Sequence, residues 1–350
     1  MTSPPPDPRR MGVLLLNLGS PDAPTTRAVR RYLRDFLSDP RVLDFPAPIR
    51  RVVLETVILP IRSRRSATLY QNIWDKKTGS PLLHFTAQLR DKVAGELGDD
   101  FVVAYGMRYG SPSIESAWTS LRQAQVRHVI VVPLYPQETA STIGSAMEEL
   151  NKVMAKDWVP TPISVVPAFY NDEAFLDALT EVTRETLAQA PADHVLFSFH
   201  SIPQRHITKA DSTGSHCFRQ DNCCADAGSA VAAGCYRAQC LRTATAVAQR
   251  LNLTHWSVSF QSRLGRIPWV EPYTDLEFIR LAGEGVKDLV VVCPAFVADN
   301  LETVEEIGIR GVKQWAQAGG SQLTLVPGLN DRPLWVQAVA GLIRAQCVDV

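Results

Sequence analysis

In this 350-residue sequence, a histidine at the end of an apolar run is a leading candidate for a catalytic residue. His200 follows HVLFSF (194–199) and directly precedes Ser201. With an ordinary pKa of about 6.5, an imidazole at such a position accepts protons at neutral pH. The position also suits a core histidine that bonds to the backbone, and the residue alone leaves both interpretations open.

Carboxylates form a second group after another apolar run, LVVVCPAF (289–296). If a helix follows this run, Glu302 and Glu306 lie one turn apart on the same side, and Asp299 lies just before them. Carboxylates on one face can bind a hard divalent cation or relay protons. Acidic residues are equally ordinary at helix N-termini, which they stabilise. Glu305 is expected to be solvated.

Five of the seven cysteines fall in one short segment. They are Cys217, Cys223, Cys224, Cys235 and Cys240. Their spacing lacks the paired CxxC of many zinc sites, whereas an iron–sulfur cluster needs four thiolates and five are available. A cluster, a zinc site and free thiols remain alternatives, while a cytoplasmic setting disfavours disulfides. Cys293 lies in an apolar run and is expected to be a core residue.

Polar and aromatic side chains follow other apolar runs. They are Arg108, Tyr109, Tyr135, Ser141, Thr142 and Trp269. Arg108 can pair with a carboxylate through two hydrogen bonds. Ser141 and Thr142 could instead be helix caps, Tyr109 could be a core residue, and a tryptophan after a proline commonly packs in a loop.

The elements that must position these residues alternate along the chain. Nearly continuous apolar runs, typical of parallel strands covered on both faces, are separated by helical patterns. The expected strands are 13–17, 101–105, 128–134, 163–169, 194–199, 256–260, 289–296 and 322–328. The expected helices are 26–37, 85–97, 114–124, 141–154, 174–190, 236–251 and 302–316. This alternation predicts an α/β fold with parallel, doubly wound sheets.

The two halves of the chain resemble each other: VLLLNLGSPD is similar to VLFSFHSIPQ, and FVVAYGMRYGSP to WSVSFQSRLGRIP. We therefore expect two Rossmann-like lobes with a cleft between them, in which ligands bind beyond the carboxyl ends of the strands. The expected parts are a disordered tail (1–10), lobe I (11–170) and lobe II (171–331) with a Cys-rich insertion (211–240), and the last helix (332–346) is free to pack back on lobe I.

Composition excludes several classes of protein. Lysine plus arginine and aspartate plus glutamate are equal at 36 each, so the basic excess of a general nucleic-acid binder is missing. Neither a signal peptide nor an apolar stretch of about 20 residues is visible, which predicts a cytoplasmic protein, at most attached to a membrane surface. No glycine-rich phosphate loop follows a strand.

Taken together, the segments LNLGSPD, MRYGSP, PLYPQETASTIGS, FSFHSIPQRH, FQSRLGRIPWVEP and CPAFVADNLETVEEI resemble ferrochelatase, the enzyme that inserts Fe²⁺ into a porphyrin. The resemblance runs from about Met11 to about Ala340 in the family's order. It implies a chelatase-like fold, a lyase of haem synthesis, and porphyrin and Fe²⁺ as substrates.

The resemblance also implies roles for individual residues. His200 would accept the pyrrole protons, Glu302 would face it and contact Fe²⁺ with it, and Glu306 would continue an acidic path. His194 and His206 are expected to be structural. The positions that would line the porphyrin pocket are Leu15, Arg108, Tyr109, Tyr135, Ser141, Thr142 and Trp269. Four of the five clustered cysteines would hold a [2Fe–2S] cluster, as in a minority of ferrochelatases, and Cys240 would be the spare.

Three alternatives stay open at this stage. One is a coproporphyrin rather than a protoporphyrin IX preference, and one is a cobalt or nickel chelatase for a less oxidised tetrapyrrole. The third is a non-catalytic tetrapyrrole or iron carrier. Oligomeric state cannot be read from the sequence. Because the product is apolar, peripheral contact with the inner face of the membrane is expected, with Leu33, Phe36 and Leu37 as candidate residues. The same residues equally fit the buried face of an amphipathic helix.

Overall fold

The computed structural model describes residues 10–219, 222–225, 231, 234–265 and 267–347. Almost all of the expected tail (1–10) and parts of the expected insertion (211–240) therefore lie outside the described residues. Within them the chain forms two compact units. Unit 1 takes the chain up to Tyr135, Thr139–Ala168 and the chain from Asn330 onward, and unit 2 takes Pro136–Glu138 and Phe169–Leu329.

Unit 1 is built on a parallel sheet of four strands in the order β2-β1-β3-β4. They are β1 (Met11–Ser20), β2 (Phe101–Gly110), β3 (His128–Pro133) and β4 (Ile163–Val165). Both neighbours of β1 run parallel to it, so that Leu15 pairs with Tyr105 on one side and Val132 on the other. Nearly every residue of β1 is buried, which explains its unbroken apolar pattern.

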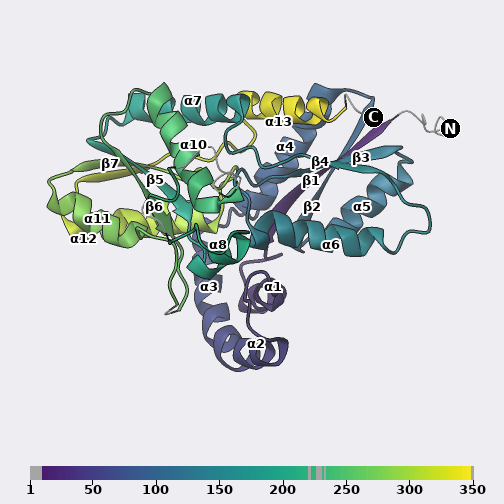
Figure 1. Ribbon diagram of the computed structural model, residues 1–350, viewed down its shortest axis with the longest axis horizontal. Helices are drawn as coiled ribbons and strands as arrows, with labels where there is room; N and C mark the ends of the chain where they lie inside the picture. Colours follow the sequence, from purple (N-terminus) through teal and green to yellow (C-terminus); the bar gives the residue numbers. More distant parts are fainter. Residues whose placement is uncertain (1–9, 220–221, 226–230, 232–233, 266, 348–350) are drawn as a thin grey trace. The chain divides into compact units, whose positions relative to one another are not determined.

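Helices cover this sheet (Figure 1). They are α1 (Thr26–Ser38), α4 (Pro81–Leu97), α5 (Ile114–Gln123), the π-helix η2 (Ala140–Gly144), α6 (Ser145–Met154) and α13 (Pro333–Ala345). The C-terminal helix α13 packs on α4, and Arg344 next to its end donates to the Glu96 carbonyl at 2.7 Å. Unit 1 is thus completed by the last segment of the chain.

One helical segment of unit 1 is absent from the sequence prediction. It comprises α2 (Ala47–Val53), the π-helix η1 (Leu54–Ile58) and α3 (Leu59–Ile73). Figure 1 shows α2 beyond α1, away from the unit 1 sheet. The sequence pattern does not predict these helices because their apolar residues do not form a single buried stripe: Ile49, Val52 and Ile61 are exposed.

Unit 2 repeats the sheet topology of unit 1, with parallel strands in the order β6-β5-β7-β8. They are β5 (His194–His200), β6 (Trp256–Gln261), β7 (Asp288–Val292) and β8 (Gln322–Leu325). The helices are α7 (Glu173–Gln189), α8 (Gln204–Ala210), α10 (Tyr236–Arg250), α11 (Thr274–Gly283), the π-helix η3 (Leu301–Gly311) and α12 (Val312–Ala318). The prediction of α/β architecture with two parallel sheets is confirmed.

The π-helices occupy equivalent places in the two units, because η2 follows β3 and η3 follows β7. Each begins at a polar residue whose side chain accepts a backbone N–H: Thr139 before η2 and Asn300 before η3. π-Helices are rare, and those that occur are often at functional sites. The π-helices η2 and η3 therefore indicate that the functional residues lie at these ends of the sheets. Among the described residues, no helix is long and apolar enough to cross a membrane.

Candidate active site

His200 is the last residue of β5, where the strand leaves the sheet of unit 2. Its Nδ1 lies 2.5 Å from the Ser201 carbonyl oxygen. A carbonyl only accepts hydrogen bonds, so Nδ1 must carry the proton and Nε2 keeps its lone pair. Burial lowers the pKa of this imidazole below its ordinary value, and the bond to Ser201 offsets part of that effect. The ring is therefore neutral at neutral pH and has one nitrogen ready to accept a proton.

The turn after His200 is held by bonds to three segments of unit 2. The Ser201 backbone N–H donates to the Gln261 carbonyl at 2.7 Å, and the Ser201 hydroxyl donates to the Val270 carbonyl at 2.9 Å. The Tyr236 hydroxyl donates to the His200 carbonyl at 2.7 Å. The bonds of the Ser201 N–H and the His200 carbonyl fix the peptide between His200 and Ser201, and the hydroxyl bond fixes the Ser201 side chain; together they restrain the residue whose carbonyl accepts the imidazole proton.

Glu302 and Glu306 lie on η3, which begins after the end of β7. Burial, with a further contribution from the neighbouring Glu306 charge, raises the pKa of Glu302 to about 7. Burial also raises the pKa of Glu306, and hydrogen bonds from the Ser262 backbone and hydroxyl oppose that rise. The two residues are four positions apart on the same helix, and the Glu306 charge contributes to the shift at Glu302. Such a pair can hold a proton near neutral pH and release it when a cation arrives.

Glu305 corrects the expectation that it is solvated. Its side chain is buried, with 4% of the residue exposed, and it pairs with Arg310 at 3.0 Å. A buried carboxylate needs such a partner because an isolated charge is strongly unfavourable away from water. The spacing of Glu302 and Glu306 predicts that they lie on the same side of the helix. It does not predict that Glu305, on another side, is also buried.

Asp299 and Asn300 shape the start of η3. The Asn300 side chain accepts from the Thr303 N–H while the Thr303 hydroxyl accepts from the Asn300 N–H, both at 3.0 Å. Asp299 accepts from the Gly328 N–H at 3.0 Å. Asn300 is therefore the cap of η3, and Asp299, Glu302 and Glu306, for which the sequence left capping open, are not its cap residue.

Gln261 is a site residue that sequence reasoning missed. It is 3% exposed and pairs with His200 in the sheet. Its side-chain nitrogen donates to the Glu302 carbonyl at 2.8 Å, and its oxygen accepts from the Ser198 hydroxyl at 2.7 Å. One amide thus connects the strand of the histidine to the helix of the carboxylates. Its place as a polar residue directly after an apolar strand run was the available signal.

Trp269 lies in the loop that packs against the His200 turn. Its backbone forms a bridge with Pro203 and accepts from the Gln204 side chain at 3.0 Å. The indole N–H donates to the Leu264 carbonyl at 2.8 Å, and the side chain is half-buried. The loop-packing interpretation therefore accounts for the indole nitrogen, while part of the ring surface stays accessible for stacking.

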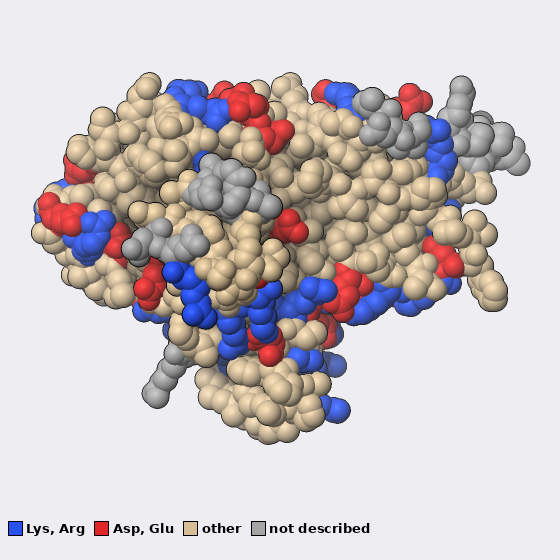
Figure 2. Space-filling view, in the orientation of Figure 1, with Lys and Arg blue, Asp and Glu red and all other residues tan. Residues whose placement is uncertain are grey.

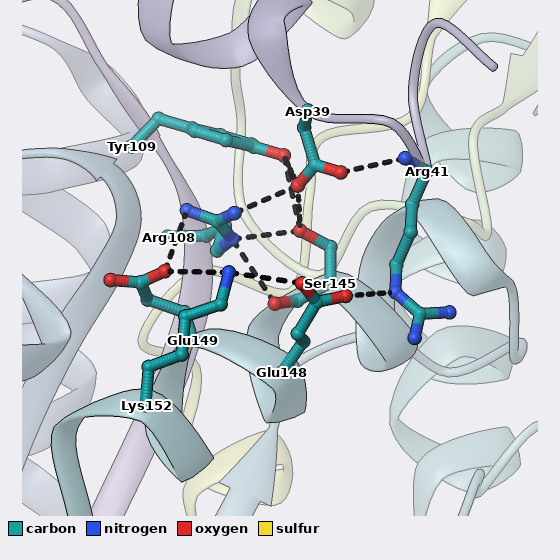
Figure 3. A network of polar contacts seen from close by, with 8 residues as sticks. All are labelled: Asp39, Arg41, Arg108, Tyr109, Ser145, Glu148, Glu149 and Lys152. Atoms are coloured by element: carbon teal, nitrogen blue, oxygen red, sulfur yellow. Dashed lines mark hydrogen bonds and ion pairs between the residues drawn. The ribbon is translucent and has the colours of Figure 1, made fainter. Parts of the chain in front are cut away.

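The remaining expected pocket residues lie in unit 1, where Arg108 and Tyr109 belong to a polar network. Figure 3 shows the guanidinium of Arg108, the phenol of Tyr109 and the hydroxyl of Ser145 converging on Asp39. The three donor–acceptor distances to one Asp39 oxygen are 2.8, 2.9 and 2.5 Å. Burial alone would raise the pKa of this carboxyl, but these bonds and the Arg41 N–H hold it below its ordinary value.

This network argues against the expectation that Arg108 pairs with a porphyrin propionate. Its Nη2 is bonded to Asp39 and its Nε to Ser145, and its Nη1 faces Glu149 at 3.8 Å. Bidentate binding of a propionate needs two free parallel N–H groups, and the edge formed by Nε and Nη2 is already engaged by Ser145 and Asp39. Sequence could not reveal this, since the partner Asp39 is distant in the chain.

Leu15, Tyr109 and Tyr135 are core residues of unit 1, with exposed fractions of 0%, 2% and 7%. Leu15 lies in the middle of β1 between two paired strands, so it has no surface to offer a ligand. The Tyr135 hydroxyl is buried without a hydrogen-bond partner among the described residues. Ser141 and Thr142 lie in the first turn of η2, where both hydroxyls lie within hydrogen-bond distance of Thr139, the residue that caps it.

The clustered cysteines lie in unit 2 as free thiols. The Cys235 sulfur accepts hydrogen bonds from the thiols of Cys224 and Cys217, and the bond from Cys224 is the largest cause that lowers the pKa of Cys235 to about 6. Cys240 is fully buried within α10 beside Tyr236. Within the described part of the chain, no three His, Cys, Asp or Glu side chains are arranged to hold a metal ion. Cys293 is buried, as expected of a core residue.

The described geometry can be compared with known proteins. A family model described as Ferrochelatase matches residues 10–347. The chain is 48% identical over 337 residues to a protein named Ferrochelatase from Coxiella burnetii (strain CbuK_Q154), which covers 96% of this chain and 93% of the relative. It is 46% identical over 332 residues to a Ferrochelatase from Pseudomonas fluorescens (strain Pf0-1), covering 94% and 96%.

A similar fold occurs in a solved structure, the sirohydrochlorin chelatase SirB from Bacillus subtilis subspecies spizizenii in complex with cobalt. The TM-score is 0.53, with 96% of this chain and 94% of that chain covered, and the identity is 12%. That likeness concerns the fold alone. The family model and the curated relatives span nearly the whole sequence, so the chain belongs to the ferrochelatase family.

Proposed function

We propose that this chain inserts Fe²⁺ into protoporphyrin IX to form protohaem, with His200 accepting the pyrrole protons. As a ferrochelatase it is a lyase-class metal chelatase of haem synthesis. The observation that supports the role of His200 is its tautomer: Nδ1–H is held by the Ser201 carbonyl, and Nε2 is left as an acceptor. A base with a pKa below its usual range stays unprotonated at neutral pH, which porphyrin metallation requires.

Two protons must leave the pyrrole nitrogens as the metal enters. His200 takes the first at Nε2, and the Ser201 carbonyl stabilises the imidazolium through Nδ1–H. Glu302 and Glu306 continue the route for protons, because the pKa of Glu302 is raised to about 7 and burial raises the pKa of Glu306 as well. In this proposal His200 and Glu302 also contact the incoming Fe²⁺, and the carboxylate replaces oxygen ligands lost with its hydration shell.

If His200 is the base, removing its imidazole should stop metal insertion. His200→Ala is expected to abolish Fe²⁺ and Zn²⁺ insertion while porphyrin binding, followed by tryptophan fluorescence quenching, persists. His255→Ala, an exposed histidine in the same unit, is the matched control. Retained insertion by His200→Ala would remove His200 as the base. A wild-type protein that binds porphyrin and inserts no metal would instead favour the non-catalytic carrier.

The preference for protoporphyrin IX over coproporphyrin is proposed from the number of propionate charges that the site must bind. Coproporphyrin carries more propionates than protoporphyrin IX and so needs more cations from its site. Arg108 is engaged by Asp39, so it does not contribute to that demand. We therefore expect a higher kcat/KM for protoporphyrin IX, measured by anaerobic insertion assays with both porphyrins. A higher value for coproporphyrin would overturn this preference.

Four of the clustered cysteines are proposed to hold a [2Fe–2S] cluster, with a structural or redox-sensing contribution. The donor chemistry supports Cys217, Cys223, Cys224 and Cys235, because Cys235 receives hydrogen bonds from two other thiols and its lowered pKa favours the thiolate. Cys240 is bonded to Tyr236 within α10, so it is the expected spare. The described side chains are not arranged as a finished metal site, and ligation therefore requires them to rearrange.

Visible absorption with iron, sulfide and zinc analysis of anaerobically purified protein tests the cluster. Cys240→Ala is expected to keep the colour and Cys217→Ala to lose it. A colourless, iron-free preparation would exclude the cluster, and stoichiometric zinc would favour the alternative metal.

Peripheral membrane contact is proposed through a different surface from the expected one. Leu33 and Leu37 are buried in unit 1. The α2–α3 segment exposes the apolar residues Ile49, Val52, Val57 and Ile61, next to exposed Arg51, Arg64 and Arg65. Figure 2 shows the α2 region as mainly uncharged, with basic side chains beside it. Apolar side chains bordered by arginines suit an anionic lipid surface, and this contact would place the enzyme at the cytoplasmic face of the membrane.

Sedimentation with vesicles tests this surface. Binding to vesicles that contain phosphatidylglycerol, and weaker binding to pure phosphatidylcholine, is expected. The double variant Val52→Ser and Ile61→Ser should lose binding, whereas Leu276→Ser and Ile279→Ser, which remove exposed apolar residues of α11, should keep it. Equal binding by both double variants would exclude the α2–α3 surface.

A further inference from the structure

Three buried hydroxyl groups form a line inside unit 2 that ends at Gln261. Ser198 is on β5, Ser259 is its partner on β6, and Thr274 is the first residue of α11. Their exposed fractions are 0%, 0% and 3%. The Thr274 hydroxyl lies 2.8 Å from the hydroxyls of both Ser198 and Ser259. The Ser198 hydroxyl lies 2.7 Å from Oε1 of Gln261, so each of these hydroxyls has the partner that a buried polar group requires.

The Glu302 carbonyl determines the direction of every bond in this line. A carbonyl oxygen only accepts, so the end of the Gln261 amide that lies 2.8 Å from it must be the NH₂ group. The amide oxygen therefore points to Ser198, whose hydroxyl must donate to it. A hydroxyl has one proton, so Ser198 accepts from Thr274, and Thr274 in turn accepts from Ser259. All the donors thus point along the line toward η3.

The Gln261 oxygen has a second donor, the thiol of Cys293. This residue directly follows β7, and its sulfur lies 3.6 Å from the same oxygen. A thiol is a weak donor, so the Ser198 hydroxyl contributes most of the restraint on the amide. Without that hydroxyl the amide is less restrained, and a rotated amide would turn its oxygen toward the Glu302 carbonyl, where two acceptors repel each other.

Gln261 connects this line to both parts of the candidate site. Its side chain donates to the Glu302 carbonyl, and its backbone carbonyl accepts from the Ser201 N–H at 2.7 Å. The first bond restrains the peptide that follows Glu302, and the second restrains the peptide that follows His200. Only the first depends on the orientation of the amide. The hydroxyl line therefore acts on the carboxylate part of the site and leaves the strand pairing at His200 in place.

We propose that Ser198 and Thr274 are positioning residues for metal insertion, which fix the orientation of the Gln261 amide and, through it, the backbone at Glu302. The inference rests on the proposed contact of Glu302 with Fe²⁺. When a hydroxyl is lost from the line, the amide rotates and the Glu302 carboxylate is no longer held in one direction. The KM for porphyrin stays unchanged, because the line acts on the backbone of η3 and on no residue proposed to contact the porphyrin.

The first test uses two substitutions of Thr274 that separate its hydroxyl from its packing. Thr274→Val keeps the shape and removes the hydroxyl, whereas Thr274→Ser keeps the hydroxyl and removes a methyl group. Thr274→Val is expected to lower kcat about threefold, and Ser198→Ala, which removes the donor to the amide itself, about tenfold. The KM for porphyrin should stay within about twofold of wild type in each variant, and Thr274→Ser should keep the kcat of wild type. Equal kcat values for the two Thr274 variants would overturn the positioning role.

The second test is a double-mutant cycle of Ser198→Ala with Gln261→Leu. Ser198→Ala should lower kcat in the wild-type background and cause no further loss in the Gln261→Leu background, because the hydroxyl acts only through the amide. Ser257→Ala is the matched control, because it removes a hydroxyl of β6 that bonds to His194 at 2.8 Å, and it should have no effect in either background. If Ser198→Ala fails to fold, Thr274→Val replaces it in the cycle. Multiplicative losses from the two changes would refute the positioning role.

A spectroscopic measurement follows the amide itself. In protein labelled with ¹⁵N-glutamine, the side-chain signals of Gln261, assigned with Gln261→Leu, should shift in Ser198→Ala and Thr274→Val and not in Ser257→Ala. Shifted signals with the kcat of wild type would overturn the positioning role. If Glu302→Gln still inserts metal, the proposed role of Glu302 is wrong, and so is the positioning role that rests on it. If Glu302→Gln is inactive and Ser198→Ala has the kcat of wild type, only the positioning role is wrong.

Discussion

Replacing Glu302 by glutamine should stabilise the protein in a pH-dependent manner. The folded protein raises the pKa of this carboxyl from 4.5 to about 7, through burial and the nearby Glu306 charge. Between these two values the folded state binds more protons than the unfolded state, so stability falls as the pH rises. The loss is complete once the pH exceeds the folded pKa, and it persists above that pH. Glutamine has the same shape and no proton to lose, so it avoids the penalty.

The size of the effect follows from the shift. Each pKa unit corresponds to about 1.36 kcal/mol, so the shift of Glu302 implies a cost of about 3 kcal/mol for the ionised carboxyl in alkaline solution. The side chain retains some accessible surface, and screening by solvent reduces the expected value to about 2 kcal/mol. At pH 5 most of this penalty has not yet developed. The advantage of Glu302→Gln over wild type should therefore grow by about 2 kcal/mol between pH 5 and pH 8.

Urea denaturation at both pH values, followed by circular dichroism, measures the free energy of unfolding of each protein. Glu181→Gln, on the exposed face of α7, serves as the control and should give the same difference from wild type at both pH values. The same Glu302 variant should lose metal insertion while gaining stability. A stability difference between Glu302→Gln and wild type that does not change with pH would refute the raised pKa and the proton-relay argument built on it.

Three further substitutions have defined outcomes. Asp39→Ala leaves the Arg108 guanidinium buried without its anion, and urea denaturation should reveal a loss of about 3 kcal/mol, with Arg108→Met in the Asp39→Ala background restoring part of it. Gln261→Leu removes the side chain that donates to the Glu302 carbonyl and accepts from the Ser198 hydroxyl, so kcat for metal insertion should fall with little change in the KM for porphyrin. Asn300→Ala removes the cap of η3 and should cost about 1 kcal/mol by thermal denaturation, whereas Thr303→Ser, which keeps the reciprocal hydroxyl, should cost less.

The sheets were predictable because their strands obey a simple rule. A parallel strand with helices on both faces has no solvent side, so its sequence is apolar throughout, as in β1 and β3. The internal similarity of the two halves also has a physical counterpart, since the two sheets share one strand order and carry a π-helix after the third strand. The α2–α3 segment has no such signature. Apolar Ile49, Val52, Val57 and Ile61 are exposed while the buried side of α3 includes the polar Ser63, so the apolar residues of the segment do not mark its buried face.

The placement of the candidate site residues was predictable where it depends only on a residue's position along its own element. His200 at a strand end and Glu302 and Glu306 at helical spacing are of this kind. Arg108 and Glu305 are not, because each is defined by a partner that sequence spacing does not reveal as a neighbour: Asp39 lies beyond α1, and Arg310 covers Glu305 from the next turn. Charge-bearing side chains were recognised, whereas the partners that already satisfy them in the fold were not.

The proposed base, His200, is held mainly by backbone groups, which every residue possesses. Its proton is held by the Ser201 carbonyl, Ser201 is held by the Gln261 and Val270 carbonyls, and the Tyr236 side chain donates to the His200 carbonyl. Backbone acceptors carry no sequence signal of their own, since a carbonyl is present at every position. Their direction is set by the register of β5 against β6 and by the loop that carries Trp269. A substitution that shifts this register should therefore impair the base as severely as one that removes a polar side chain, although neither His200 nor its carboxylate partners would change.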